Sequence, residues 1–320
     1  MNKNIEKFIS ELSYSNKKSI SRLISIVESS ETENEIILDQ LSNKIGNAYR
    51  VGITGPPGVG KSTLTLQLTK SLFNDGLKVG IIAVDPTSPF SGGALLGDRI
   101  RMNEITNNEN VFIRSMATRG SMGGLSKKAI DAADILDAAG FDILIFETVG
   151  VGQSEIQITE AADTKIVVLV PESGDAIQAL KAGLMEIGDI FILNKSDRPG
   201  SENAVLALKS MLQLREMTTE SWMPKIFKTI AAENIGIEEI KAEIFDHKKF
   251  LIDKNQFYNL RREKALKRIK DITIDKLNKK LWAENVIPEI DNFILPSLEN
   301  HISPYEISNQ ILNKIKFSGD

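Results

Sequence analysis

Residues 55–62 of the chain read GPPGVGKS and match the phosphate-binding pattern GxxxxGKS/T. Glycines at these positions let successive backbone N–H groups turn toward the oxygens of a phosphate chain. Lys61 would reach the β- and γ-phosphates, and the hydroxyl of Ser62 would bind Mg²⁺. An apolar run precedes the pattern and a helical stretch follows it, which is the context that the pattern requires. The sequence therefore predicts a nucleoside triphosphate site, against the alternative of a tight turn that binds no ligand. The residues predicted to contact the nucleotide here are Gly55, Pro56, Pro57, Gly58, Val59, Gly60, Lys61, Ser62 and Thr63.

Residues 194–197, NKSD, follow the apolar run DIFIL and bear on the choice of base. The carboxylate of Asp197 could accept hydrogen bonds from guanine N1–H and from the guanine 2-amino group. Adenine offers neither donor on that edge, so a buried carboxylate left unpaired would disfavour it. Lys195 would lie along the base plane with its aliphatic stem. A turn after a strand is the alternative, but together with the phosphate-binding pattern these residues favour GTP over ATP. Further contacts are predicted from Asn194 and, through backbone N–H groups, from Ile230, Ala231 and Ala232 in the segment TIAAENIG.

Three acidic residues, Asp85, Asp98 and Glu147, lie near the ends of apolar runs. Acidic residues in such places lie at the carboxyl edge of an open α/β sheet, where ligands bind. Asp85 also precedes a proline, so forming a turn is its alternative role. The predicted Mg²⁺ ligands are Ser62, Asp85, Asp98 and Glu147.

The hydrolytic water needs a group that positions it for attack on the γ-phosphate. Gln153 in ETVGVGQSE is the candidate by analogy with small GTPases. In those enzymes the glutamine directly follows the switch glycine, whereas here Val151 follows Gly150. Asp98 or a group from a partner protein is therefore the alternative, and either arrangement predicts slow intrinsic hydrolysis. The predicted catalytic residues are Lys61, Asp98, Glu147 and Gln153.

Short apolar runs alternate with helical stretches from about residue 49 to residue 231. Several runs are apolar throughout, as strands covered on both faces would be. The pattern predicts an α/β fold of the P-loop NTPase type, with a doubly wound and mostly parallel sheet. Helical periodicity before and after the runs predicts N- and C-terminal helical extensions. The expected domains are residues 1–48 for an N-terminal helical extension, 49–237 for the nucleotide domain and 238–320 for a C-terminal helical arm.

Composition narrows the classes of partner. The 320 residues carry a net charge of −4, which gives no global attraction to nucleic acid or to an anionic membrane surface. The chain has no cysteine, which excludes a disulfide framework and a cysteine nucleophile and is typical of a reducing compartment. No apolar run is long enough for a signal peptide or a membrane crossing. A cytoplasmic location without nucleic-acid or membrane partners is expected.

Taken together, the motifs resemble those of the MeaB/ArgK family of P-loop GTPases, bacterial relatives of the human methylmalonic aciduria type A protein. The segments that carry the resemblance are GPPGVGKST, VDPTSPFSGGALLGDRIRM, RGSMGGLS, ETVGVGQSE, SGDAIQALKAGLMEI and NKSD. The resemblance implies a GTPase that is a chaperone for methylmalonyl-CoA mutase or a related adenosylcobalamin-dependent acyl-CoA mutase. Such a chaperone would gate cofactor loading and protect the mutase. GTP/GDP and Mg²⁺ as cofactors, and a homodimer formed through the C-terminal arm, are also implied.

Two other functions remain open on the sequence. A transport-linked kinase or ATPase would require preference for adenine, against which Asp197 argues. A metal-insertion GTPase would generally present clusters of Cys and His. Here Cys is absent, and His247 and His301 are far apart in sequence and expected at the surface.

Overall fold

A computed structural model of the chain describes residues 3–85, 103–117, 122–148, 161–171, 183–215, 218, 220–282, 303–306 and 308–309. They fall into two compact units, Met1–Leu260 and Arg261–Asp320. Of the predicted site residues, Asp98 and Gln153 lie outside the described residues, as does the side chain of Asp85.

The centre of the first unit is a seven-stranded sheet in which every described strand pairing is parallel. The strands are β1 (Tyr49–Thr54), β2 (Val79–Asp85), β3 (Val111–Ala117), β4 (Ile143–Thr148), β5 (Thr164–Leu169), β6 (Ile190–Asn194) and β7 (Lys225–Thr229). Their order across the sheet is β3-β2-β4-β1-β5-β6-β7. Since β1 is central and the chain crosses to both sides of it, the predicted doubly wound α/β fold is confirmed.

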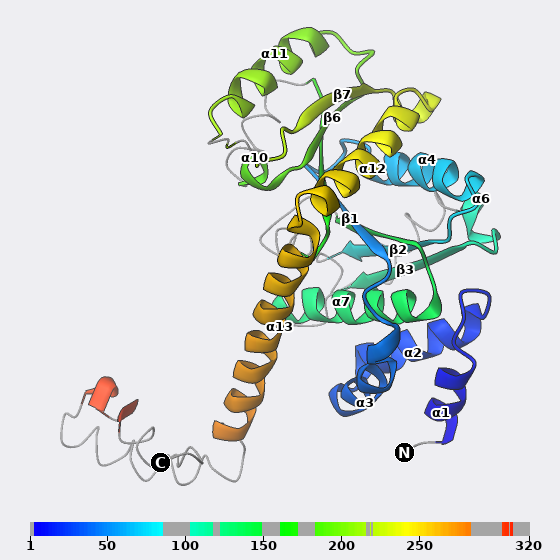
Figure 1. Ribbon diagram of the computed structural model, residues 1–320, viewed down its shortest axis with the longest axis vertical. Coiled ribbons are helices and arrows are strands. Elements are labelled where there is room, and N and C mark those ends of the chain that lie inside the picture. Colours follow the sequence, from blue (N-terminus) through cyan, green and yellow to red (C-terminus); the bar gives the residue numbers. More distant parts are fainter. Residues whose placement is uncertain are drawn as a thin grey trace. The chain divides into compact units, whose positions relative to one another are not determined.

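Helices cover both faces of this sheet (Figure 1). In the described part of the chain, the helices of the first unit are α1 (Lys3–Ser10), α2 (Lys17–Ser29), α3 (Glu31–Leu41), η1 (Ser42–Lys44), α4 (Lys61–Asn74), α6 (Asn103–Thr106), α7 (Met122–Ala139), α10 (Leu184–Ile187), α11 (Ser201–Leu212), η2 (Ala231–Glu233) and α12 (Ile237–Asp253). Helix α13 (Gln256–Leu281) lies mostly in the second unit. Alternation along the strands assigns the faces: Ile166 and Val168 of β5 pack with α4 and α12, whereas Val167 and Leu169 pack with α10 and α11.

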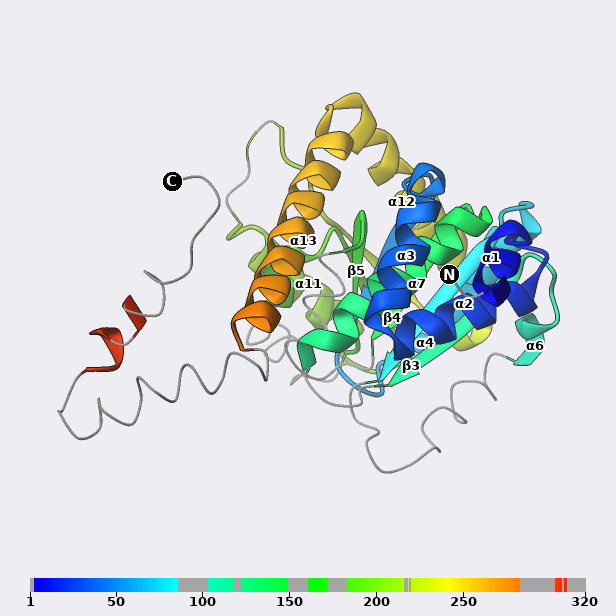
Figure 2. The ribbon, with the colours of Figure 1, turned by 90° about the horizontal axis from the view of Figure 1, so that it is seen from below.

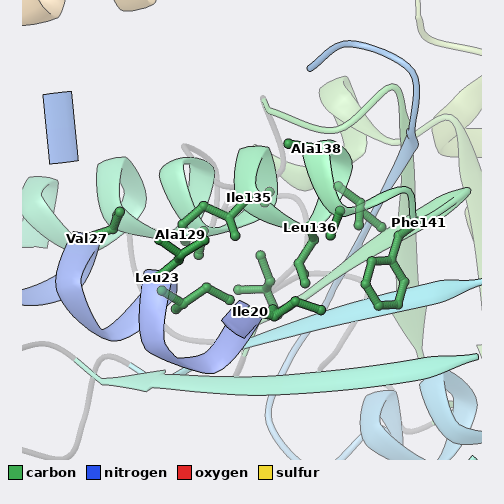
Figure 3. Close-up of a cluster of buried hydrophobic side chains, with 14 of the residues drawn as sticks. Ile20, Leu23, Val27, Ala129, Ile135, Leu136, Ala138 and Phe141 are labelled. Atoms are coloured by element: carbon green, nitrogen blue, oxygen red, sulfur yellow. The ribbon is translucent and has the colours of Figure 1, made fainter. Parts of the chain in front are cut away.

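Helices α2 and α3 pack on α7, and α1 packs on α2 and α3 (Figures 1 and 2). Ile20, Leu23 and Val27 recur at helical spacing along α2 and point toward α7, where Ile135 and Leu136 meet them (Figure 3). Burial of this stripe attaches α2 to the sheet through α7.

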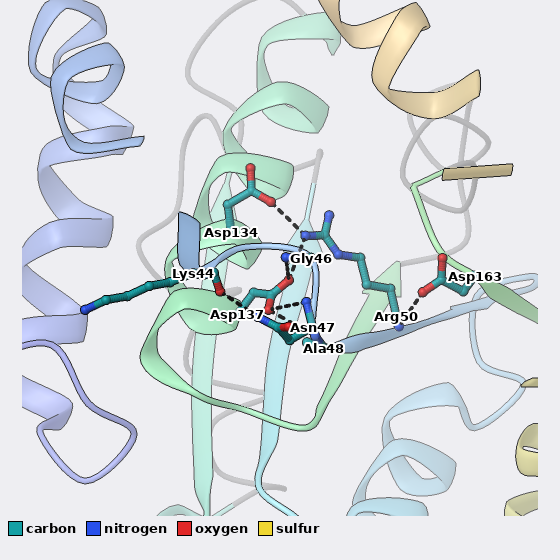
Figure 4. A network of polar contacts seen from close by, with 8 residues as sticks. All are labelled: Lys44, Gly46, Asn47, Ala48, Arg50, Asp134, Asp137 and Asp163. Atoms are coloured by element: carbon teal, nitrogen blue, oxygen red, sulfur yellow. Dashed lines mark hydrogen bonds and ion pairs between the residues drawn. The ribbon is translucent and has the colours of Figure 1, made fainter. Parts of the chain in front are cut away.

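Polar contacts join the same region to the start of β1 (Figure 4). The carboxylate of Asp137 in α7 accepts backbone hydrogen bonds from Gly46, Asn47 and Ala48 at 2.8–3.1 Å. The guanidinium of Arg50 in β1 contacts Asp134 at 2.7 Å and Asp137 at 3.4 Å. The backbone N–H of Arg50 donates to Asp163 at 3.0 Å. These bonds fix how the chain enters the central strand.

His247 in α12 is buried, with only 2% of its surface exposed. Its Nδ1 lies 2.8 Å from the hydroxyl of Thr164, and the centroid of its ring lies 4.9 Å from the centroid of the Trp222 ring. The expectation that His247 lies at the surface was therefore wrong. Ile240, Ile244 and Leu251 of α12 are buried at helical spacing, and His247 occupies one position of that stripe.

Helix α13 has no buried side chain among its residues. Among the described helices, none has both the length and the apolar character that a membrane crossing would need.

Candidate functional site

The phosphate-binding loop connects the end of β1 to the start of α4. Gly55 has φ +141°, and a Cβ there would lie 2.1 Å from the carbonyl oxygen of Val168 in β5. Gly60 has φ +97°, and its Cβ would lie 2.4 Å from the side-chain nitrogen of Asn194. Side chains at both positions would push the loop away from β5 and β6, so the glycines allow its close approach.

Lys61 is the first residue of α4 and is buried. Its ammonium donates hydrogen bonds to the carbonyl oxygens of Gly55 at 2.7 Å and Pro56 at 2.8 Å. The N-terminus of a helix carries partial positive charge and free N–H groups. A fixed ammonium at this helix terminus gives the loop the electrostatics of an anion site.

Two of the predicted Mg²⁺ ligands are in direct contact. The hydroxyl of Ser62 donates to Oε1 of Glu147 at 2.5 Å, and Glu147 is only 5% exposed. Hydroxyl and carboxylate oxygens are ligands that Mg²⁺ prefers. The backbone of Asp85 ends the neighbouring strand β2, in which Ala83 pairs with Glu147.

Asn194, the last residue of β6, holds three loops together. Its side-chain amide donates to the carbonyl oxygen of Val59 in the phosphate loop at 2.8 Å. Its Oδ1 accepts from the hydroxyl of Thr229 at 3.0 Å and from the backbone N–H of Ala231 at 3.1 Å. Since both ends of this buried amide are engaged within the protein, its role here is to fix the loops.

Lys195 and Asp197 follow in the same loop. Lys195 has φ +57°, and its ammonium donates to the carbonyl oxygen of Gly58 at 2.7 Å, which stretches its aliphatic stem from one loop to the other. The backbone N–H of Ser196 donates to the carbonyl of Thr229 at 3.0 Å. Asp197 is exposed, and no hydrogen bond or ion pair engages its carboxylate within the described part of the chain.

The third loop is closed on itself. Ile230 and Ile235 exchange backbone hydrogen bonds of 3.2 Å, with η2 between them. The N–H of Ala231 is engaged by Asn194, so it serves the shape of the loop, whereas Ala232 is exposed.

Sequence reasoning missed three hydroxyls at strand ends. Thr54 ends β1, Thr148 ends β4 and Thr229 ends β7. The hydroxyl of Thr148 shares its single proton between two acceptors, the hydroxyl of Thr54 at 3.3 Å and the carbonyl of Ile53 at 3.4 Å. The available signal was a threonine directly before the phosphate loop and another directly after Glu147.

This arrangement fits a nucleotide with Mg²⁺. The cradle tolerates only glycine where it approaches β5 and β6, a buried ammonium stands at a helix terminus, and a hydroxyl and a carboxylate meet beside it. Ser62 and Glu147 are the described residues that would hold the metal.

Comparison with known proteins gives a consistent result. Residues 20–286 match the family model described as methylmalonyl Co-A mutase-associated GTPase MeaB. A candidate GTPase of Pyrococcus horikoshii is 44% identical over 97% of this chain and 98% of its own. The mitochondrial methylmalonic aciduria type A homolog of Mus musculus is 37% identical over 60% of this chain and 47% of its own. A crystal structure of a LAO/AO transport system kinase aligns with TM-score 0.74 and 27% identity over 98% of both chains.

Proposed function

Because the chain belongs to the MeaB family of methylmalonyl-CoA mutase-associated GTPases and is thus a GTPase, we propose that it is a GTP-driven chaperone of an acyl-CoA mutase. The client would be methylmalonyl-CoA mutase or a related adenosylcobalamin-dependent enzyme. Nucleotide state would gate cofactor loading and protect the mutase.

Each residue of the site has a definite task in this proposal. Backbone N–H groups of the non-proline residues between 55 and 60, together with the ammonium of Lys61, hold the β- and γ-phosphates and stabilise the charge that develops during hydrolysis. Ser62 and Glu147 hold Mg²⁺, which when bound neutralises charge on the phosphates. Asp197 recognises guanine while the stem of Lys195 lies against the base. Asp98 and Gln153, the candidates for positioning water, rest on the sequence alone.

The observation that carries the GTP assignment is the set of bonds around Asn194. They connect the phosphate loop, the NKSD loop and the loop 229–236, which lie far apart in the sequence. A site that is preorganised at both its phosphate end and its base end loses less free energy when its ligand is bound.

Calorimetric titration with GDP and ADP in the presence of Mg²⁺ tests the base preference. We expect GDP to bind and ADP to bind far more weakly. Asp197→Asn removes a charge-assisted acceptor, worth about 1.5–3 kcal/mol, and should weaken GDP binding by about tenfold or more. Asp253→Asn, at the exposed end of α12, is the control. Unchanged discrimination in Asp197→Asn would contradict the guanine assignment.

The mutase partnership rests on the family description and on the methylmalonic aciduria relative. Purified methylmalonyl-CoA mutase should bind this protein with an affinity that differs between GDP and a non-hydrolysable GTP analogue, as measured by calorimetry. Failure to bind in both nucleotide states would remove the chaperone role for this client, and the isobutyryl- and ethylmalonyl-CoA mutases would be tested next.

A homodimer through the C-terminal arm is part of the proposal. Leu266, Ile269 and Leu277 recur at helical spacing along α13 and are exposed. Light scattering should report a dimer for the parent and a monomer for Leu266→Glu. Asp275→Lys, on the other side of the helix, is the control. A parent that scatters as a monomer would contradict this part.

The name of the aligned structure supports one rival, a transport-linked kinase. A kinase would transfer the γ-phosphate to an acceptor other than water, whereas a GTPase releases inorganic phosphate. Following γ-labelled GTP and ATP over time separates them: label that accumulates on protein or solute, with ATP as the better donor, would favour the kinase.

A further inference from the structure

We propose that the hydroxyl pair Thr54–Thr148 is a positioning device for the carboxylate of Glu147 at the Mg²⁺ site. This inference rests on the proposed GTP and Mg²⁺ binding and assigns a task to two side chains outside the phosphate-binding and guanine-binding patterns.

The pair stands where two neighbouring strands part. Residue pairing between β1 and β4 runs up to Ile53 and Glu147. One residue later, Thr54 pairs with Val167 of β5, while Thr148 pairs with Val84 of β2. The last residue of β1 thus pairs with β5, and the last residue of β4 pairs with β2. The hydroxyl bonds from Thr148 to Thr54 and to the carbonyl of Ile53 connect the ends of β1 and β4 beyond their last paired residues.

The end of β4 is held from both faces of the sheet. Ile53, which pairs with Glu147, packs in the cluster that includes Leu64 and Leu68 of α4, and Glu147 itself bonds Ser62 of that helix. Successive side chains of a strand point to opposite faces, so Thr54 and Thr148 lie on the other face. One bond therefore directs Glu147 toward α4, and the other fixes the backbone that carries it.

Burial makes the hydroxyls informative. Thr54 is 0% exposed and Thr148 is 2% exposed. A buried hydroxyl costs free energy unless it is hydrogen-bonded, and valine has nearly the same shape without that cost. The contribution of the two threonines is therefore the hydrogen bond that the Thr148 hydroxyl shares between Thr54 and the carbonyl of Ile53. Its loss would let the end of β4 move and would place the carboxylate of Glu147 less accurately beside Ser62.

Thr148→Val and Thr148→Ser, measured in the full chain, test the inference. Calorimetry gives the dissociation constant of GDP with Mg²⁺ and again with EDTA, and the ratio is the gain in affinity due to the metal. We expect Thr148→Val to reduce this ratio by about three- to tenfold, the loss of one hydrogen bond, with the EDTA value unchanged. Thr148→Ser, which keeps the hydroxyl, should behave as the parent does.

Thr69→Val is the matched control, because Thr69 of α4 is fully buried and its hydroxyl has no hydrogen-bond partner among the described residues. Thr54→Val removes one of the two acceptors of the Thr148 hydroxyl and leaves the carbonyl of Ile53, so it should lower the ratio in the same direction but by less. It replaces Thr148→Val in the test if that variant does not fold. A metal ratio in either valine variant equal to that of Thr69→Val overturns the inference. So does an equal loss of affinity in EDTA, or a serine variant that behaves like valine. Failure of the parent to bind GDP would instead refute the proposed function.

Discussion

At the scale of single residues, Asn194 makes contacts within the protein that its sequence motif does not reveal. The sequence places it in a guanine-recognition pattern, yet its amide bonds Val59, Thr229 and Ala231. Three contacts with residues 35 to 135 positions away cannot be deduced from local spacing, because they depend on which strands are neighbours. The contact between Ser62 and Glu147 was easier to predict. Both side chains carry oxygens that Mg²⁺ prefers, and two ligands of one metal ion must lie close together.

Replacing Asn194 by alanine should weaken the binding of GDP by at least about tenfold. Each buried group left without its partner costs about 1–3 kcal/mol, and the loops would lose their common anchor. Asn34→Ala is the control, because Asn34 is also buried and donates at 2.7 Å to Asp131, away from the site. That control should lower the melting temperature and leave GDP affinity unchanged. If both variants bind GDP as the parent does, Asn194 does not organise the site.

At the scale of elements, the loop before α12 depends on Gly236. Gly236 has φ +83°, and a Cβ there would lie 2.7 Å from the carbonyl oxygen of Lys228. Gly76 has φ +84° with nothing within 4 Å of its Cβ position. Both Gly→Ala changes cost about 1–2 kcal/mol of backbone strain, but only Gly236→Ala should displace the loop 229–236. We expect GDP affinity, measured by calorimetry, to fall in Gly236→Ala alone. Equal affinities would show that this loop does not contribute to base binding.

Helices α4 and α12 are joined at the surface by Ser71, Glu238 and Lys241. Hydrogen bonds from Lys241 and then from Ser71 hold the pKa of Glu238 below its ordinary value of 4.5. A carboxylate with a lowered folded pKa stabilises the fold above its ordinary pKa, and this contribution is lost as pH falls through the lowered value. Between about pH 5 and pH 3, urea unfolding should therefore show a smaller loss of stability in Glu238→Gln than in the parent. The unfolding stability of Glu239→Gln should fall with pH as that of the parent does. An equal loss of stability in all three proteins would contradict this role of Glu238. The effect is small because Glu238 is largely exposed.

At the scale of the whole molecule, the order of elements was accessible from sequence because buried parallel strands appear as continuous apolar runs. RVGITG and DIFIL are examples, and they became β1 and β6. The burial of single polar residues was harder to predict from the sequence. His247 stands on a charged helix, and its position in the buried stripe follows from how α12 lies on the sheet. The three-part division of the chain stays a prediction.

Arg50 connects β1, α7 and Asp163, so its removal should affect the whole first unit. Burial alone would lower the pKa of Arg50, but Asp134, Asp137 and Asp163 outweigh it and raise that pKa above its ordinary value. Its stabilising charge is thus fully present at neutral pH, well below that value. Arg50→Met removes the guanidinium that lies beside the buried carboxylates of Asp134 and Asp137, and it should cost about 3–5 kcal/mol of unfolding free energy in urea. Lys254→Met, from an exposed ion pair with Glu220, should cost less than about 1 kcal/mol. Similar losses in the two variants would contradict this role for Arg50.

The place of β1 in the sheet also determines how long this strand stays unpaired during synthesis. Val51 of β1 pairs with Ile145 on one side and Thr164 on the other. The strand that leads into the phosphate loop therefore emerges from the ribosome long before either neighbour. At about 5–20 residues per second, the delay is on the order of ten seconds. Throughout that interval the nascent chain exposes an unpaired apolar strand. The partly synthesised chain is therefore prone to aggregation and is a target for chaperones.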